Sequence, residues 1–293
     1  MSANVFATIQ CTPAGTCQCR RFNVQAVTFP NYNFLMGSPL VQDVLASIEC
    51  RSRNSPSGQS FVSFEVTLNG NISGRMMTQG SNQISFNVYH PNSSSIILGE
   101  NGNAYTFTGN VGNNYTVIPI TFPALIPTNQ NVIDGPYQKR YQFRLTHPQK
   151  NGTRTRKKNV GFRVNTDKVC QVSATDLNFG TYYASNTSPT DSVGTFSFQC
   201  TPNITGIISV NQGTGSQSYT NRVLSNSNNK LNYNIYTNVA HSIIFGDGSG
   251  GSQAISGNTT GGQQSFNYYG QIPSKQYVRT GYYSSSLVAT LTL

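Results

Sequence analysis

The feature that most constrains this chain of 293 residues is an internal repeat at a nearly constant offset. The matched segments are Phe29-Pro-Asn-Tyr32 with Phe179-Gly-Thr-Tyr182 and Cys50 with Cys200 (offset 150), Phe86-Asn-Val-Tyr89 with Tyr233-Asn-Ile-Tyr236 (offset 147), and Ile126-Pro127 with Ile272-Pro273 (offset 146). A drift of only four over more than a hundred residues indicates two homologous domains in tandem. We place them at residues 1–165 and 166–293.

The composition predicts an all-β fold. Only 10% of the residues are charged, and 27 are glycines, a mixture that suits short strands and turns better than helices. Each copy shows short alternating segments separated by Gly, Asn and Ser, which is typical of an immunoglobulin-like β-sandwich. We expect strands near 20–29, 44–50, 61–68, 83–89, 95–98, 115–121, 140–146 and 160–165 in the first copy, and near 170–181, 194–200, 205–210, 231–237, 242–245, 264–270 and 285–293 in the second.

The last segment of the chain predicts that the two copies differ by one strand. Its residues Leu287, Ala289, Leu291 and Leu293 alternate with Val288, Thr290 and Thr292, as in a strand with one face in a core. The counterpart in the first copy carries Tyr141, Phe143 and Leu145, and it is followed by a further alternating run, Val160, Phe162 and Val164. We therefore expect the second domain to lack its final strand, with Leu287, Ala289, Leu291 and Leu293 along the edge of an open groove.

The six cysteines predict disulfide bonds formed in an oxidising compartment. The spacings Cys19–Cys50 and Cys170–Cys200 are nearly equal, and Cys11 with Cys17 would close a small local loop. The alternative is a metal site that uses Cys17 and Cys19. It is disfavoured because no histidine and no second Cys-x-x-Cys lie nearby.

Positive charge is concentrated in the first copy. Residues 1–165 hold 14 Lys and Arg against 5 Asp and Glu, a balance of +9. The densest run, Arg154, Arg156, Lys157 and Lys158, falls in a segment, 147–159, that we expect to be a loop. This run is either a solvated connection between two strands or a basic patch that meets an anionic surface or polymer.

The second copy resembles the spore coat protein U domain family. The resemblance rests on Cys170, Asp176-Leu-Asn-Phe179-Gly-Thr-Tyr182, Cys200, Leu231-Asn-Tyr-Asn-Ile-Tyr236, Phe245-Gly-Asp-Gly248, Tyr269-Gly-Gln-Ile-Pro273 and Gly281-Tyr282. The first copy resembles the family more weakly, with Phe29-Pro30 in place of Phe-Gly. This family supplies pilin subunits of the archaic, Csu-type chaperone–usher pili. The resemblance implies a periplasmic chaperone, an outer-membrane usher and the next pilin subunit as partners, and it implies secretion through the periplasm to the cell surface.

Two apolar segments of the first copy have polar counterparts in the second. Phe34, Leu35, Met36 and Leu40 belong to one, and Phe122, Leu125 and Ile126 belong to the other. These side chains either close the ends of the sandwich or form apolar loop tips that bind an abiotic or host surface.

No arrangement of residues indicates an enzyme, a metal site or a cofactor. The three histidines, His90, His147 and His241, fall on separate segments and are interpreted as surface or turn residues. The glycine-rich run beginning at Gly246 lacks the lysine and the helix of a phosphate-binding loop, so we interpret it as a tight turn, with calcium binding as the weaker alternative. No apolar run reaches the length of about 18 residues that spans a membrane, so we expect no membrane insertion.

The function that fits best is a two-domain tip adhesin of a Csu-type pilus, which acts in biofilm formation. The first domain would bind surfaces, and the second would join the fibre by strand addition from another chain. One alternative is a shaft or coat subunit that only polymerises. For that role the alternating Ala3, Val5, Ala7 and Ile9 would have to donate a strand. Another alternative is a basic module that binds polysaccharide or nucleic acid.

Overall fold

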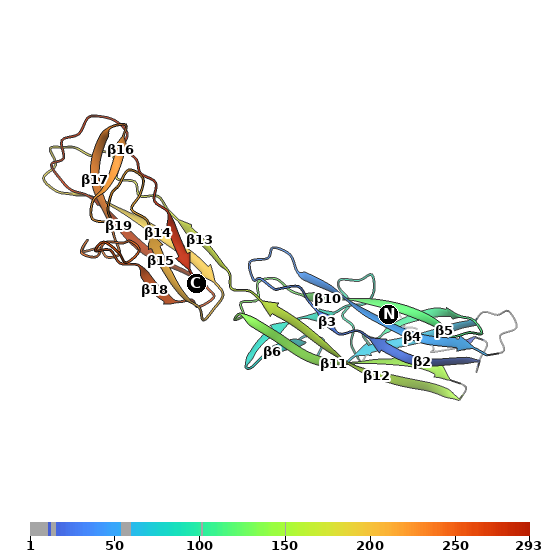
Figure 1. Ribbon diagram of the computed structural model, residues 1–293. Helices are drawn as coiled ribbons and strands as arrows, with labels where there is room; N and C mark the ends of the chain where they lie inside the picture. The colour runs from blue at the N-terminus through green and yellow to red at the C-terminus, as the bar shows by residue number, and fades with distance from the viewer. Residues whose placement is uncertain (1–10, 13–15, 54–59, 101, 150) are drawn as a thin grey trace, which may run out of the picture. The chain divides into compact units, whose positions relative to one another are not determined.

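The computed structural model describes residues 1–293 except 1–10, 13–15, 54–59, 101 and 150 (Figure 1). The described residues form strands, bridges, turns and bends, with no helix among them. They divide into two compact units, Met1–Asp167 (unit 1) and Lys168–Leu293 (unit 2). Both units are immunoglobulin-like β-sandwiches, so the all-β fold predicted from the sequence is confirmed.

Unit 1 consists of two packed sheets. Its strands are β1 (Cys11–Thr12), β2 (Cys17–Val24), β3 (Val27–Thr28), β4 (Leu40–Ser52), β5 (Ser60–Leu68), β6 (Met76–Gln79), β7 (Asn82–Ser85), β8 (Asn87–Val88), β9 (Tyr105–Val111), β10 (Thr116–Ile126), β11 (Gly135–Gln149) and β12 (Gly152–Thr166). The larger sheet has the order β1-β5-β11-β12-β3, with β9 also on β5 and the β6–β7 hairpin attached to β11. The smaller sheet has the order β2-β4-β10-β8.

The core of unit 1 follows from the alternation of its strands. In β4 the buried Val44, Ala46 and Ile48 alternate with more exposed residues, and β10 pairs with β4 along its whole length. In the facing sheet, Phe143 on β11 and Phe162 on β12 are fully buried. Successive side chains of a strand point to opposite faces, so these inner faces close on each other as a sandwich core.

Unit 2 repeats this plan with fewer strands. They are β13 (Cys170–Ala174), β14 (Thr190–Cys200), β15 (Thr205–Val210), β16 (Arg222–Asn226), β17 (Asn229–Tyr236), β18 (Ile255–Asn258), β19 (Gln263–Ile272) and β20 (Ala289–Thr292). One sheet has the order β13-β14-β19-β17-β16 and the other the order β18-β15-β20. In chain order and pairing, β14, β15, β19 and β20 correspond to β4, β5, β10 and β11.

The six cysteines form three disulfides, with the pairing that their spacing predicts. Cys19–Cys50 joins opposed residues of β2 and β4, and Cys170–Cys200 joins opposed residues of β13 and β14. Cys11–Cys17 links β1 to β2, and therefore ties the two sheets of unit 1 together.

The prediction of a basic loop over 147–159 is wrong. The β11–β12 ladder runs without interruption from Gly135 opposite Thr166 to Gln149 opposite Gly152. The Thr-Arg-Thr-Arg alternation after Gly152 suits an exposed strand, and the Thr146 and Thr155 hydroxyl oxygens lie 3.0 Å apart across the pair. Charge was misinterpreted as a loop signal, because a strand that extends past the core can remain charged.

Other strand predictions differ from the structure in a consistent way. The strands expected at 95–98 and 242–245 are only isolated bridges, Tyr89 with Ile97 and Tyr236 with Ile244. Strands β6, β9, β16 and β18 were not predicted. Strands β9 and β18 contain Gly and Asn, which are poor strand formers. Pairing with β5 and β15 overrides that local preference.

Two buried arginines, also unpredicted, occupy equivalent places in the repeat, at an offset of 147. Arg75 donates from Nη2 to the Leu68 carbonyl at 2.9 Å, and Arg222 donates from Nη2 to the Phe245 carbonyl at 2.7 Å. Each also donates from Nη1 to an asparagine of the next strands, Asn87 or Asn234. Burial lowers the pKa of Arg75 to about 10. Both guanidinium groups therefore hold neighbouring segments of the chain in place, because they donate hydrogen bonds to backbone carbonyls of those segments.

A glutamine performs the same role in each unit. The Gln130 side chain accepts from the Ser85 amide and donates to the Ser85 carbonyl, and Gln276 does the same with Asn232. Their backbone amides donate to the hydroxyls of Tyr32 and Tyr182, respectively. The Tyr and Gln that recur in the two copies therefore fix the loop that follows β10 in unit 1 and the loop that follows β19 in unit 2.

His147 is fully buried in β11, not placed at the surface or in a turn. Its Nε2 accepts a hydrogen bond from Arg156 Nε at 3.3 Å, so Nδ1 carries the proton and donates to the Pro148 carbonyl at 3.0 Å. The imidazole is therefore neutral. Burial, opposed by the Pro148 bond and reinforced by the charges of Arg156 and Arg154, lowers its pKa.

This histidine predicts an acid-sensitive unit 1. As the pH falls below about 6.5, His147 takes up a proton in the unfolded chain but stays neutral in the folded protein, where it is buried. The free energy of unfolding should thus be level above that pH and decline below it, by at most about 1.4 kcal/mol per pH unit. Urea unfolding between pH 7.5 and 5 measures this slope. His147→Gln should flatten it and the control His90→Gln should not; equal slopes in all three proteins contradict the prediction.

Candidate functional site

One of the two edges of strand β20 has no partner strand among the described residues of unit 2. On its other edge β20 pairs with β15, from Ile207 opposite Thr292 to Val210 opposite Ala289. In unit 1 the corresponding β11 has β5 on one side and β12 on the other. The prediction that unit 2 lacks its final strand is therefore confirmed.

The missing strand leaves a second backbone segment without a sheet partner. In unit 1, β12 also pairs in parallel with β3, through Phe162 with Val27 and Arg163 with Thr28. At an offset of 150, Val27 and Thr28 correspond to 177 and 178, which lie outside the strands of unit 2. We call the backbone of β20 and of residues 177–179 the open edge.

In unit 1, Phe162 fills the space that corresponds to the open edge. Its ring centroid lies 4.8 Å from that of Phe86, 6.1 Å from that of Tyr141 and 6.5 Å from that of Phe143. By the repeat, these three neighbours correspond to Tyr233, Leu287 and Ala289 in unit 2. None of the described strands of unit 2 takes the place of β12, which carries Phe162 in unit 1.

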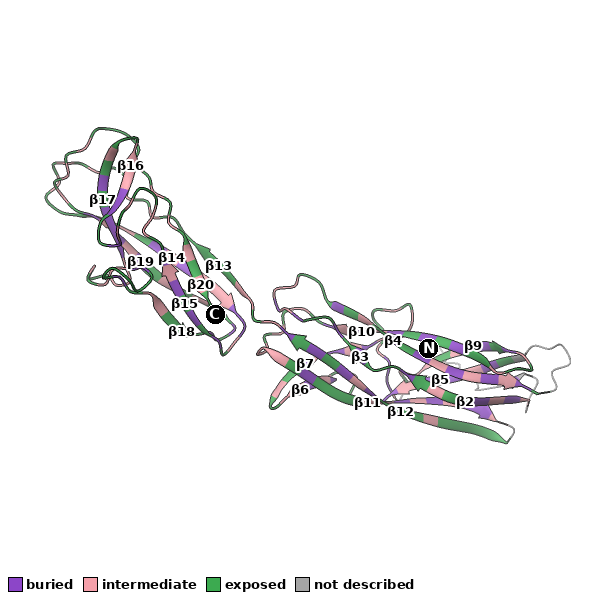
Figure 2. Cartoon of the chain, in the orientation of Figure 1, coloured by how far each residue is buried: buried purple, intermediate pink, exposed green. Residues whose placement is uncertain are grey.

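The side chains along the open edge are correspondingly less buried. In unit 1, Val27, Phe29 and Tyr32 are 2%, 3% and 2% exposed. Their counterparts Leu177, Phe179 and Tyr182 are only partly buried, and they pack against the core cluster of unit 2. Figure 2 shows the same contrast between purple segments along β11 and β12 and the pink and green of β20.

The residues predicted for this edge divide into two groups. Leu287, Ala289 and Leu291 are half-buried and pack against the core cluster, so they lie on the core face as their alternation predicts. Leu293 lies beyond β20 and is 45% exposed, so its assignment to the core face is wrong. The alternation of the sequence continues to Leu293, but the pairing with β15 ends at Thr292.

The predicted surface-binding loops are wrong for most of their residues. Phe34, Leu40, Phe122 and Ile126 are buried, while Leu35, Met36 and Leu125 are half-buried. Residues 120–126 belong to β10, and Phe122 lies opposite Val44 inside the sandwich. The alternative interpretation, that these side chains close the sandwich, fits the structure.

Three exposed apolar side chains of unit 1 lie instead on the outer face of the β2-β4-β10 sheet. Val41, Leu45 and Val117 are 53%, 45% and 56% exposed. The register places Val41 opposite Leu125 and Val117 opposite Glu49, so all three share one face of β4 and β10. The signal for them was present in the period of two along β4, which assigns the odd-numbered residues to the outer face.

The basic residues predicted as a patch lie on β12. Arg154, Lys157 and Lys158 are exposed, and Arg156 is half-buried, where it contacts His147 and the Cys19 carbonyl.

No group of three or more potential metal ligands gathers among the residues that the structure describes. Asp247 accepts hydrogen bonds from the Ser249 amide and hydroxyl, as in a tight turn. The Nε2 atom of the half-buried His241 lies 3.9 Å from a carboxylate oxygen of the exposed Asp191. In the described part of the chain, no helix is long and apolar enough to cross a membrane. Ala3, Val5, Ala7 and Ile9 lie outside the described residues.

Both halves of the chain match one family model. The Spore Coat Protein U domain model matches residues 2–141 and 157–290. The chain therefore belongs to the Spore Coat Protein U domain family, with two copies of the domain. A search of curated protein sequences found no match.

A structure search found matches to solved structures of pilus proteins, of which the first shares the fold. A chain of the CsuC–CsuE chaperone–tip adhesion subunit complex, from archaic chaperone–usher Csu pili of Acinetobacter baumannii, is 14% identical, with 94% of this chain and 100% of that chain covered and a TM-score of 0.58. The adhesin CfaE of enterotoxigenic Escherichia coli is 12% identical over 92% of each chain, with a TM-score of 0.30. The CooA pilin of the same organism is 11% identical over 52% of this chain and 99% of its own, with a TM-score of 0.33.

Proposed function

We propose that this chain is the tip adhesin of a Csu-type chaperone–usher pilus, with unit 2 as the acceptor of a strand from another subunit. The observation that carries the proposal is the difference between the units at one position. Unit 1 fills that position with its own β12, and unit 2 leaves it open with half-buried apolar residues on both sides. Membership of the family and the fold shared with pilus proteins support the same role.

Strand addition supplies what the open edge lacks. An added strand pairs with the open edge, that is, with the unpaired edge of β20 and with residues 177–179, and its alternate side chains cover the core. Unit 1 shows the side chains that such a strand needs, because Val160, Phe162 and Val164 are 2%, 0% and 1% exposed. Before assembly, a periplasmic chaperone protects the open edge. The outer-membrane usher and the next pilin subunit then complete the path to the cell surface.

The closed sheet of unit 1 supports a tip position. Unit 1 already contains all its strands, so a chain of this kind accepts one strand, in unit 2, and leaves unit 1 free for binding. We propose that unit 1 attaches the cell to abiotic or host surfaces during biofilm formation. The exposed Val41, Leu45 and Val117 are its best candidates for contact with an apolar surface.

The first prediction concerns completion of unit 2. The full chain is extended at its C-terminus by a turn and a copy of the β12 sequence. This extension should raise the unfolding temperature of unit 2, on the order of 10 °C. The reason is that it buries three apolar side chains, which contribute roughly 1.5–3 kcal/mol each. Calorimetry measures that temperature. A control extension has Ser at the three positions copied from Val160, Phe162 and Val164. The proposal fails if both extensions behave alike, or if the unextended unit 2 is already monomeric and equally stable.

The second prediction concerns position in the fibre. Gold-labelled antibodies against unit 1 should mark the ends of intact pili in electron micrographs, because a subunit that accepts a strand in unit 2 and donates none sits at one end of the fibre. Antibodies against the major fibre subunit serve as the control and should label the whole length. Labelling of unit 1 along the shaft favours the alternative, a subunit that only polymerises.

The third prediction concerns adhesion. Changing Val41, Leu45 and Val117 to Ser should lower the retention of piliated cells on polystyrene severalfold, and 1 M salt should not lower it, because apolar contact survives screening. The matched control changes Val172, Val193 and Val239, which are similarly exposed on unit 2. Retention that falls in salt and ignores the unit 1 changes contradicts this part of the proposal.

A further inference from the structure

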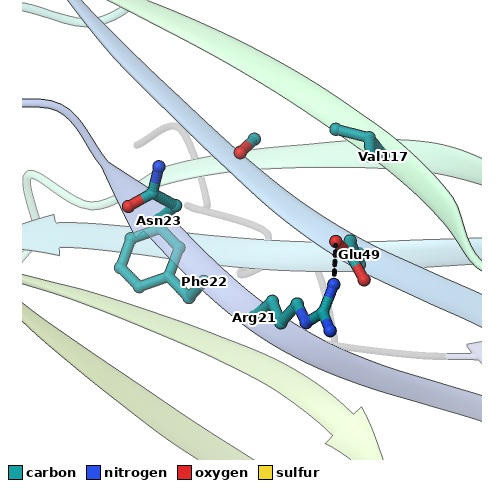
Figure 3. A pocket seen from close by; sticks show the side chains of 6 residues that line it. Arg21, Phe22, Asn23, Glu49 and Val117 are labelled. Carbon is teal, nitrogen blue, oxygen red and sulfur yellow. Dashed lines mark hydrogen bonds and ion pairs between the residues drawn. The ribbon is translucent and has the colours of Figure 1, made fainter.

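A strained bulge in β2 shapes a hollow on the outer face of the smaller sheet of unit 1. The register of β2 against β4 shifts between Arg20 and Asn23, and Arg21 adopts a positive φ of 51°. That conformation is unfavourable for a residue with a side chain, and such strain collects at functional sites. Figure 3 shows Arg21, Phe22 and Asn23 on one side of the hollow, and Glu49 and Val117 on the other. Its volume is about 460 Å³.

Arginines beside this hollow are held in fixed positions. The guanidinium carbon of Arg20 lies 3.6 Å from the centroid of the Tyr115 ring, and that of Arg51 lies 4.4 Å from it. Arg51 also donates from Nη2 to the Gln18 side chain at 3.1 Å. Cation–π contact and hydrogen bonding therefore orient two guanidinium groups on adjacent strands.

A third strand adds positive charge at the same end of unit 1. Strand β12 packs beside β2 there, and Arg156 donates to the Cys19 carbonyl at 2.7 Å. Burial and then the neighbouring charge of Arg154 lower the pKa of Arg156, a sign that like charges are crowded. We define the arginine surface as Arg20, Arg21, Arg51, Arg53, Arg154 and Arg156.

This charge is only slightly compensated. Among the described residues, Glu49 is the one carboxylate in contact with the arginine surface, at 2.9 Å from Arg20 and 3.4 Å from Arg21. The hydrogen bond from Arg20 lowers the pKa of Glu49, so that carboxylate stays ionised. Within the described part of the chain, Arg53 and Arg154 are exposed and pair with no carboxylate. The surface keeps a large excess of positive charge.

We propose that the arginine surface binds an acidic polysaccharide, a chain whose sugar units carry carboxylate or sulfate groups. The planar fork of arginine bonds such groups through two parallel hydrogen bonds. The six arginines come from β2, β4, the residue that follows β4, and β12, so they suit a polymer with repeated charges better than one small anion. The proposal does not depend on strand addition to unit 2.

The aromatic residues near this surface favour a polysaccharide over a nucleic acid. Proteins that bind single-stranded nucleic acid stack the bases on open aromatic rings. Tyr115 is the ring placed between these arginines, and the Arg20 guanidinium already lies over it at 3.6 Å. Between Arg20 and Arg51 the surface therefore offers charge without an open ring, because the Arg20 guanidinium covers Tyr115.

The test measures binding of the full chain to immobilised polygalacturonate, which carries carboxylates, and to heparin, which carries sulfates, in 150 mM salt. The chain should bind at least one of them, and the preferred polymer identifies the anionic group. The triple variant Arg51→Gln, Arg53→Gln and Arg154→Gln should bind at least tenfold more weakly. The double variant Arg53→Gln and Arg154→Gln, which leaves the Tyr115 contacts intact, should bind severalfold more weakly and covers the case in which the triple variant does not fold.

The matched control removes the same number of charges elsewhere on unit 1, through Lys139→Gln, Arg140→Gln and Arg163→Gln. These side chains are exposed on β11 and β12 toward the opposite end of that hairpin, and their loss should change affinity by less than twofold. Three outcomes overturn the proposal: no binding to either polysaccharide, equal losses in the control and in the surface variants, or tighter binding to a 20-nucleotide single-stranded DNA than to both polysaccharides.

Discussion

The pairing of the last two strands of a sheet is the constraint on which this structure depends. Every backbone amide and carbonyl removed from water needs a partner, and a sheet edge that also borders the core needs apolar cover. Unit 1 meets both needs with one hairpin, since β12 pairs with β11 and carries Phe162 into the aromatic cluster. Unit 2 has the same plan without that hairpin. The rest of its sandwich, with its disulfide, buried Arg222 and the Gln276 contacts, is assembled around an unfinished side.

Long-range features could be predicted from the sequence because each produces a sequence pattern that does not depend on local conformation. The repeat located two similar domains, nearly equal spacings paired Cys19 with Cys50 and Cys170 with Cys200, and alternation in two unequal copies revealed the absent strand. Features that depend on tertiary neighbours were missed. Strand β9 contains Gly109 and Asn110 and is a strand only because β5 pairs with it. Phe122 falls just outside the strand expected at 115–121, although its register with Val44 places it in the core.

The candidate site follows the same division. The core-facing residues of the final segment were predictable from their period of two, although Leu293 was not, because no residue of β15 pairs with it. The run from Arg154 to Lys158 was recognised as basic. The sequence did not indicate that arginines of β2 and β4 lie near this run. Arg20 and Arg51 are 31 residues apart, and Arg51 and Arg154 are more than 100 residues apart. The position of Tyr115 between Arg20 and Arg51 is visible only in three dimensions.

The hairpin between β11 and β12 also sets when each unit can fold. A strand tethered by a short turn is present at a high effective concentration beside its acceptor, so closure of unit 1 is unimolecular and independent of how much protein the cell makes. Under the proposed function, unit 2 receives its strand from a second molecule, and completion of its sandwich becomes a bimolecular event governed by mass action. One polypeptide thus contains two copies of the same sandwich whose final folding steps have different reaction orders. Unit 1 is completed by its own strand, and unit 2 is completed only when a second molecule binds.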